Sequence, residues 1–88
     1  MKVKFFAGFA SITKEKERDF QATDARELFE KIIAHYGDDM QEKLMPGGVL
    51  PESLVILVNG KHIRHLNGME TELTEADVVS IFPMVSGG

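Results

Sequence analysis

The residues with the clearest capacity for chemistry stand at the end of the sequence, which reads Phe82-Pro83-Met84-Val85-Ser86-Gly87-Gly88. Glycine lacks Cβ, so a Gly-Gly pair can pass through a narrow catalytic cleft and leaves a terminal carboxylate open to attack. Fully extended, residues 84–88 reach roughly 17 Å beyond Pro83. We therefore expect Val85, Ser86 and Gly87 to thread a cleft of another protein, where Gly88 reacts.

A carboxylate is a poor electrophile, so forming an acyl bond at Gly88 requires activation, most simply as an acyl-adenylate made from ATP. The chain lacks the G-x-x-x-x-G-K-[ST] loop that cradles nucleotide phosphates, since Gly47-Gly48 is followed by Val49-Leu50-Pro51. ATP must therefore be held by a partner enzyme. We expect this chain to be the substrate of the activation and to bind no cofactor tightly.

The composition argues against several other kinds of site. With no cysteine, the chain has no thiolate nucleophile and no thiolate zinc site. His62 and His65 have no third ligand at a useful spacing, so we predict no metal site and two solvent-exposed histidines. The net charge of −4 lacks the positive field that attracts nucleic acid or anionic lipid.

The remaining acidic and membrane signals are weak as well. The cluster Asp38, Asp39, Glu42 and Glu52 is interpreted as a solvated loop, because it does not match a calcium-binding loop. The sequence shows no signal-peptide pattern, and no apolar stretch approaches the roughly 20 residues that span a bilayer. We expect a cytoplasmic protein that does not enter a membrane.

One amphipathic helix is the strongest element of the pattern. Its apolar residues recur at spacings of three and four, namely Ala25, Leu28, Phe29, Ile32 and Tyr36. Asp24 is the predicted N-cap, Glu27 completes an acidic capping box, and Gly37 stands where a left-handed C-cap is expected. These signals predict a helix over residues 24–36.

The β-favouring segments predict five strands, at Val3–Phe6, Arg18–Gln21, Leu54–Val58, Lys61–Ile63 and Val78–Phe82. Asn59-Gly60 is a strong hairpin signal between the third and fourth of them. We expect a loop over residues 11–16. Residues 38–51 should form a surface excursion, with room for a short helical turn over residues 38–44.

The resulting order is β-β-α-β-β-β, in which one helix can cover only one face of a small sheet. The predicted fold is a single α+β domain over residues 1–88, with a mixed sheet of about five strands covered on one face by one main helix. Pairing the first and last strands in parallel at the centre gives the ubiquitin-like β-grasp. Residues 84–88 are expected to form a flexible tail.

The alternation along the strands predicts a second functional feature. Val79 and Ile81 suit the core, which sends Phe82 to the open face of the sheet, where Phe6 also emerges. Phe6 and Phe82, with His62 at their margin, would form a partner-binding patch beside the tail. The alternative is that these rings only cover the lower edge of the sheet.

Several motifs combine into a family resemblance: Val3-Lys4-Phe5-Phe6-Ala7, Glu27-Leu28, Val58-Asn59-Gly60, Asp77-Val78-Val79-Ser80-Ile81-Phe82-Pro83 and Val85-Ser86-Gly87-Gly88. Together they resemble the MoaD family, the small sulfur-carrier subunits of molybdopterin synthase. The thiamine sulfur carrier ThiS and the archaeal ubiquitin-like small modifiers are close relatives of that family. The resemblance covers nearly the whole chain and departs at Met84, where a second proline is usual, and in the longer segment 38–51.

The resemblance implies that an E1-like enzyme adenylates Gly88 and that a sulfur donor protein converts the adenylate to a thiocarboxylate. The large subunit of molybdopterin synthase would then use that sulfur to build the dithiolene of molybdopterin. Two alternatives share the same activation: a protein modifier joined to target lysines through Gly88, and a thiamine-type sulfur carrier. A β-grasp interaction domain with an inert tail ranks last.

Overall fold

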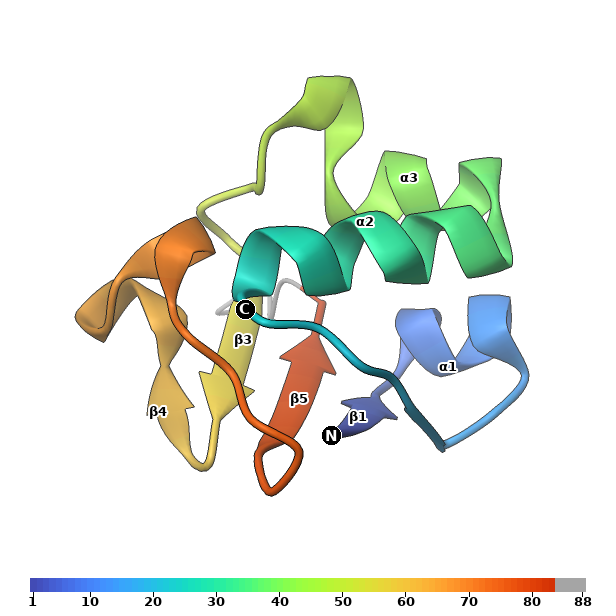
Figure 1. Cartoon of the computed structure of the whole chain (residues 1–88). Coiled ribbons are helices and arrows are strands. Elements are labelled where there is room, and N and C mark those ends of the chain that lie inside the picture. The colour runs from blue at the N-terminus through green and yellow to red at the C-terminus, as the bar shows by residue number, and fades with distance from the viewer. Residues whose placement is uncertain (84–88) are drawn as a thin grey trace.

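The computed structural model describes residues 1–83, in which helices lie over one face of a small sheet (Figure 1). The strands are β1 (Lys2–Phe5), β2 (Glu17–Asp19), β3 (Val55–Val58), β4 (Lys61–His62) and β5 (Val78–Phe82). The α-helices are α1 (Gly8–Thr13), α2 (Ala25–Tyr36) and α3 (Asp38–Leu44), and short 3-10 helices span Pro46–Gly48, Ile63–His65 and Gly68–Glu70.

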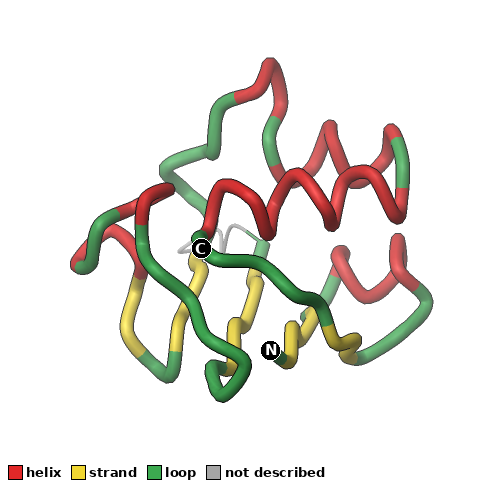
Figure 2. Tube along the Cα trace, in the orientation of Figure 1, coloured by secondary structure: helices red, strands yellow, loops and turns green. Residues whose placement is uncertain are grey.

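The sheet has the order β2-β1-β5-β3-β4. β1 and β5 pair in parallel at its centre, whereas β2, β3 and β4 join through antiparallel pairings. Figure 2 shows α2 and α3 above the strands of this sheet. The predicted α+β arrangement, with the first and last strands parallel at the centre of a mixed sheet, is confirmed.

The start of α2 follows the predicted capping chemistry. The Asp24 carboxylate accepts a hydrogen bond from the Glu27 amide at 2.8 Å, and the Glu27 carboxylate accepts one from the Thr23 amide at 2.7 Å. The capping box therefore closes on the residue before the N-cap. At the other end, Gly37 has φ 92° and donates to the Ile33 carbonyl at 2.7 Å, which ends the helix at the expected residue.

The core lies between the sheet and the helices. The central strands place every second side chain in it, namely Val3, Phe5, Ile56, Val58, Val79 and Ile81. The apolar stripe of α2 packs onto them through Ala25, Leu28, Phe29 and Ile32. The prediction of the core face is confirmed for both elements.

Helix α1 corrects the predicted loop over residues 11–16. It begins without a side-chain cap, and Ala7 before it has φ 50° and ψ −125°, a backbone conformation unusual for a residue with a Cβ. Its residue Phe9 is fully buried. The sequence has neither a capping residue nor a long apolar stripe that would indicate this short helix.

Helix α3 confirms the helical turn predicted over residues 38–44 but corrects the interpretation of residues 38–51 as a surface excursion. Met40 and Leu44 are fully buried, and Met45 is 9% exposed. The segment therefore completes the core beside α2 on one side, whereas its polar side chains, such as Asp38, Asp39 and Glu42, and its continuation through residues 46–49 are exposed.

Four strands have boundaries that differ from the prediction. β1 begins and ends one residue early, and β3 begins at Val55 rather than Leu54. β2 begins at Glu17 and ends at Asp19 rather than Gln21, and Phe20 after it packs against the core. β4 stops at His62, and Ile63 is buried at the start of a 3-10 helix.

No helix within residues 1–83 combines the length and the apolar character that crossing a membrane requires.

Candidate functional site

The open face of the sheet carries the alternate side chains of the same strands. The pairing registers align Lys4, Ser80, Leu57 and His62 in one row across β1, β5, β3 and β4. All four of these residues are half-buried. The row therefore crosses four of the five strands on the side away from α2.

Phe6 and Phe82 lie side by side at the carboxyl end of the two central strands. The Phe6 amide donates to the Ile81 carbonyl at 3.1 Å, which extends the parallel pairing one residue beyond β1. The two rings are stacked, with centroids 4.2 Å apart and planes 10° from parallel. Phe6 remains 36% exposed and Phe82 is half-buried. The structure brings these two predicted residues together, and we call them the Phe6–Phe82 stack.

His62 lies farther from the stack than the sequence analysis expected. It stands on the edge strand β4, two strands from β5, a separation of about 10 Å. Its Nδ1 accepts a hydrogen bond from the Arg64 amide at 3.2 Å. His62 is half-buried rather than solvent-exposed, whereas His65 is exposed as expected. His62 therefore shares the open face with the stack, but β3 lies between it and the strand that carries Phe82.

The stack immediately precedes the residues with the proposed chemistry. β5 ends at Phe82, and Pro83 after it is half-buried. Met84 and the predicted site residues Val85, Ser86, Gly87 and Gly88 lie outside the described residues, so their roles stay predictions. Within residues 1–83, no group of three His, Asp or Glu side chains could hold a metal ion.

A hydrogen-bond cluster fixes the opposite end of β5. The Asn59 side chain, on a residue with φ 52°, donates to Asp77 at 2.8 Å and accepts from the Val78 amide at 2.9 Å. Asp77 also accepts from the Thr74 amide at 2.7 Å. The hydrogen bond from Asn59 is the main cause that lowers the pKa of Asp77. The sequence predicted the turn at Asn59-Gly60, but no pattern in it indicated that Asn59 would form hydrogen bonds with Asp77 and Val78.

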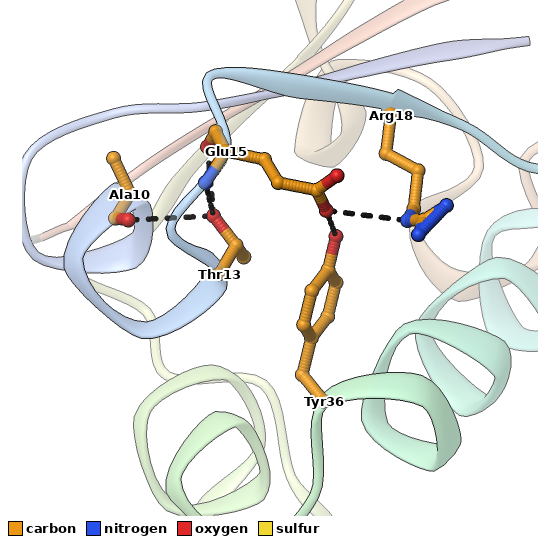
Figure 3. A network of polar contacts seen from close by, with 5 residues as sticks. All are labelled: Ala10, Thr13, Glu15, Arg18 and Tyr36. Carbon is orange, nitrogen blue, oxygen red and sulfur yellow. Dashed lines mark hydrogen bonds and ion pairs between the residues drawn. The ribbon is translucent and has the colours of Figure 1, made fainter.

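A second polar cluster, outside the open face, links α1, β2 and α2 (Figure 3). The Tyr36 hydroxyl donates to the Glu15 carboxylate at 2.6 Å, and Arg18 Nε donates to the same oxygen at 3.2 Å. Burial, together with the Glu15 carboxylate, raises the pKa of Tyr36 to about 12. The Tyr36 hydrogen bond in turn lowers the pKa of Glu15. Sequence reasoning missed this cluster, because Tyr36 lies 21 residues from Glu15 along the chain.

The site as a whole is suited to binding. Its exposed part is an aromatic stack on a rigid central strand pair, and surfaces of this kind commonly mark contacts with other proteins. Any covalent chemistry would fall on the residues that follow Pro83.

Comparisons with known proteins identify the family to which this chain belongs. The model of the ThiS family matches residues 3–88. Small archaeal modifier protein 3 of Haloferax volcanii is 31% identical over 91 residues, covering 100% of this chain and 98% of that protein. A protein of Archaeoglobus fulgidus named "Putative sulfur carrier protein" is 35% identical over 80 residues, covering 90% of this chain and 91% of that one.

Solved structures give the same fold. The solution structure of small archaeal modifier protein 1 from Methanosarcina acetivorans matches with a TM-score of 0.87 and 31% identity, covering 99% of this chain and 94% of that one. A chain of the Amycolatopsis orientalis BexX/CysO complex matches with a TM-score of 0.86 at 22% identity, over 99% of this chain and 98% of that one. These matches confirm the ubiquitin-like β-grasp and the wider ThiS/MoaD superfamily. The narrower resemblance to MoaD stays a prediction.

Proposed function

We propose that this chain, which belongs to the ThiS family, is a carrier whose Gly88 carboxylate is activated by an E1-like enzyme and then handed to an acceptor. The observation that carries the proposal is the parallel pairing of β1 with β5, which ends at the Phe6–Phe82 stack. In the sequence, only residues 83–86 separate Phe82 from the Gly87-Gly88 pair. A partner that binds the stack is thereby positioned to receive the residues after Pro83.

The activation proceeds by two displacements. An oxygen of the Gly88 carboxylate attacks the α-phosphorus of ATP held by the enzyme, and pyrophosphate leaves, which gives the acyl-adenylate. A nucleophile then attacks the activated carbonyl and AMP leaves. The chain itself needs no bound cofactor for this sequence, because ATP and the nucleophile come from its partners. We place the reaction in the cytoplasm, where ATP is available.

The first candidate acceptor is the amine of a lysine on a target protein, which would form an isopeptide bond with loss of a proton. Two archaeal relatives at 31% identity, each covering nearly the whole chain, are named as modifier proteins. Their names support conjugation as the leading hypothesis for this chain.

The second candidate is sulfur transfer, supported by the relative at 35% identity that is named as a sulfur carrier. A sulfur donor protein would deliver a hydrosulfide equivalent to the adenylate, giving a Gly88 thiocarboxylate as AMP leaves. The large subunit of molybdopterin synthase is then the acceptor that the sequence resemblance suggests, and a thiamine-type pathway is the other. CysO, whose complex with BexX contains a chain of this fold, supports a protein partner for such a carrier.

The mass of the protein purified from its own cells separates the two candidates. A species heavier by the difference between one sulfur and one oxygen atom identifies the thiocarboxylate. A ladder of conjugates that carry residues 1–88 on lysines of other proteins identifies the modifier. A variant without Gly88, expressed in the same cells, is the control and should show neither. If the intact chain also shows neither form, the proposal is wrong.

A further inference from the structure

A surface pocket lies on the β2 side of Phe6, opposite its stacking partner on β5. Its apolar part is formed by Phe5, Phe6, Ala7 and Ala10, and Lys4, Lys16 and Glu17 stand around it. Its volume is about 420 Å³. An apolar cavity of about 150 Å³ is known to hold benzene, so this pocket has room for an aromatic side chain. We call it the Phe6 pocket.

Backbone geometry and small side chains keep this pocket open. Ala7, with φ 50° and ψ −125°, turns the chain sharply between β1 and α1. Ala10 faces the space with only a methyl group and is half-buried. The Phe5 amide donates to the Lys16 carbonyl at 2.9 Å, which fixes Lys16 on the far side. The pocket is therefore part of the folded frame, between β1, β2 and α1.

The charges around the pocket are unbalanced. The Glu17 carboxylate already forms an ion pair with Lys2 Nζ at 3.2 Å. Within residues 1–83, neither Lys4 nor Lys16 has an acidic partner within ion-pair distance. Two uncompensated ammonium groups thus flank an apolar pocket, in a chain whose net charge is −4.

We propose that the Phe6 pocket receives an aromatic side chain flanked by carboxylates, presented by the partner protein that receives the C-terminus. The apolar floor would desolvate the ring, and Lys4 and Lys16 would pair with the flanking carboxylates. The Phe6 ring belongs to both the pocket and the Phe6–Phe82 stack, so a partner docked on the stack also covers the pocket. This inference rests on the proposed carrier function for the identity of the partner.

The charge of the whole molecule makes the proposal testable with small probes. A chain of net charge −4 attracts a basic peptide and repels an acidic one at long range. Preference for an acidic peptide must therefore come from local lysines. The probes are acetyl-Asp-Phe-Asp-amide and acetyl-Lys-Phe-Lys-amide, titrated into the full chain and followed by the NMR chemical shifts of its backbone amides.

Lys16→Glu is the test variant, because Lys16 is exposed and its replacement leaves the core intact. Lys14→Glu is the matched control: it makes the same charge change at an exposed lysine two residues away that does not line the pocket. We expect the acidic peptide to shift the amides of Ala7 and Ala10. Lys16→Glu should weaken its binding about fivefold, and Lys14→Glu less than twofold.

Three results would overturn the proposal: no shifts at Ala7 and Ala10, equal or tighter binding of the basic peptide, or equal loss in the two variants. The peptides do not involve activation of Gly88. Failure of the carrier function would therefore leave the peptide result standing, and failure of the pocket would leave the activation chemistry untouched.

Discussion

The covered and open faces of the sheet are made by alternating residues of the same strands, yet they differ in packing. Ile56 on the covered face is 1% exposed, whereas its neighbour Leu57 on the open face is half-buried. Ile81 is fully buried, whereas the adjacent Phe82 contributes its ring to the stack. Burial of apolar area drives folding on one face, and incompletely covered apolar area remains available for association on the other.

The comparison shows how a chain of 88 residues can separate stability from recognition. Successive side chains of a strand point to opposite faces of the sheet, so one residue packs in the core and the next lies on the open face. Substitutions on the covered face should therefore affect unfolding, and substitutions on the open face should affect binding.

The largest expected effect is on the covered face. Leu28→Ala and Ile56→Ala each empty a site that is 1% exposed, which should lower the free energy of unfolding by about 2–5 kcal/mol. Denaturant titration measures the loss. The matched control is Leu57→Ala, one residue along the same strand, which should cost clearly less. Equal losses for Ile56→Ala and Leu57→Ala would erase the proposed difference between the faces.

The next effect concerns binding at the open face. Phe82→Ala and Phe6→Ala should weaken binding to an E1-like partner or to the large synthase subunit by about 2 kcal/mol, which is roughly thirtyfold. Their unfolding free energies should change much less than that of Ile56→Ala. Calorimetric titration against the partner measures the affinity, and a denaturant melt of each free variant measures the free energy of unfolding. If affinity stays within twofold while the melt shifts by several kcal/mol, these rings belong to the core.

A smaller effect is expected from the Tyr36–Glu15 hydrogen bond, which belongs to neither face of the sheet. Tyr36→Phe should lower the free energy of unfolding near neutral pH by about 1–2 kcal/mol, because the carboxylate loses its phenol donor. Partner binding should not change. A variant that folded as stably as the original would assign no stabilising role to this hydrogen bond.

The same residue has a signature at alkaline pH. Folding raises the pKa of Tyr36 from its ordinary value of 10.0 to about 12, so its stabilising contribution is present below pH 10 and lost as the pH rises to 12. Tyr36 is the only tyrosine and the chain has no tryptophan, so ultraviolet absorbance reports its ionisation directly. Ionisation of Tyr36 near pH 10 in the folded chain would contradict the burial of its hydroxyl and its hydrogen bond to Glu15.

The smallest effect is at the amino end of β5. Asp77→Ala removes the partner of Asn59 and Thr74 and should cost about 1 kcal/mol. Folding lowers the pKa of Asp77 below its ordinary value of 3.8, so its contribution is present above that pH and lost as the pH falls below it. Denaturant melts across that range, with and without the substitution, measure this difference. An identical pH dependence in the two chains would contradict the assignment.

Much of this fold followed from local signals in the sequence. Asp24 and Glu27 marked the start of α2, Asn59-Gly60 marked the hairpin, and the alternation through Val78–Phe82 gave the last strand with its correct residues. These signals are local, because each depends on side-chain and backbone preferences within a few residues. The pairing of Phe6 with Phe82 was also predictable, once the first and last strands were placed side by side.

The parts that the sequence did not predict depend on tertiary contacts. Helix α1 has no side-chain cap and follows an alanine at positive φ. The helical turn of α3 was predicted but its place in the core was not, since it buries only Met40 and Leu44 on one short face. Two apolar residues four apart are too few to distinguish a core helix from a loop. The Phe6 pocket was likewise out of reach, because β1, β2 and α1 each contribute to it.

The central claim is that Gly88 carries the activated carboxylate, and ATP–pyrophosphate exchange catalysed by the E1-like enzyme from the same cells tests it most directly. The full chain should support exchange, and a chain without Gly88 should not, although both should give the same circular dichroism melt because residues 84–88 follow the last core strand. Exchange that continues at the same rate without Gly88, or its absence with the intact chain, would contradict the account.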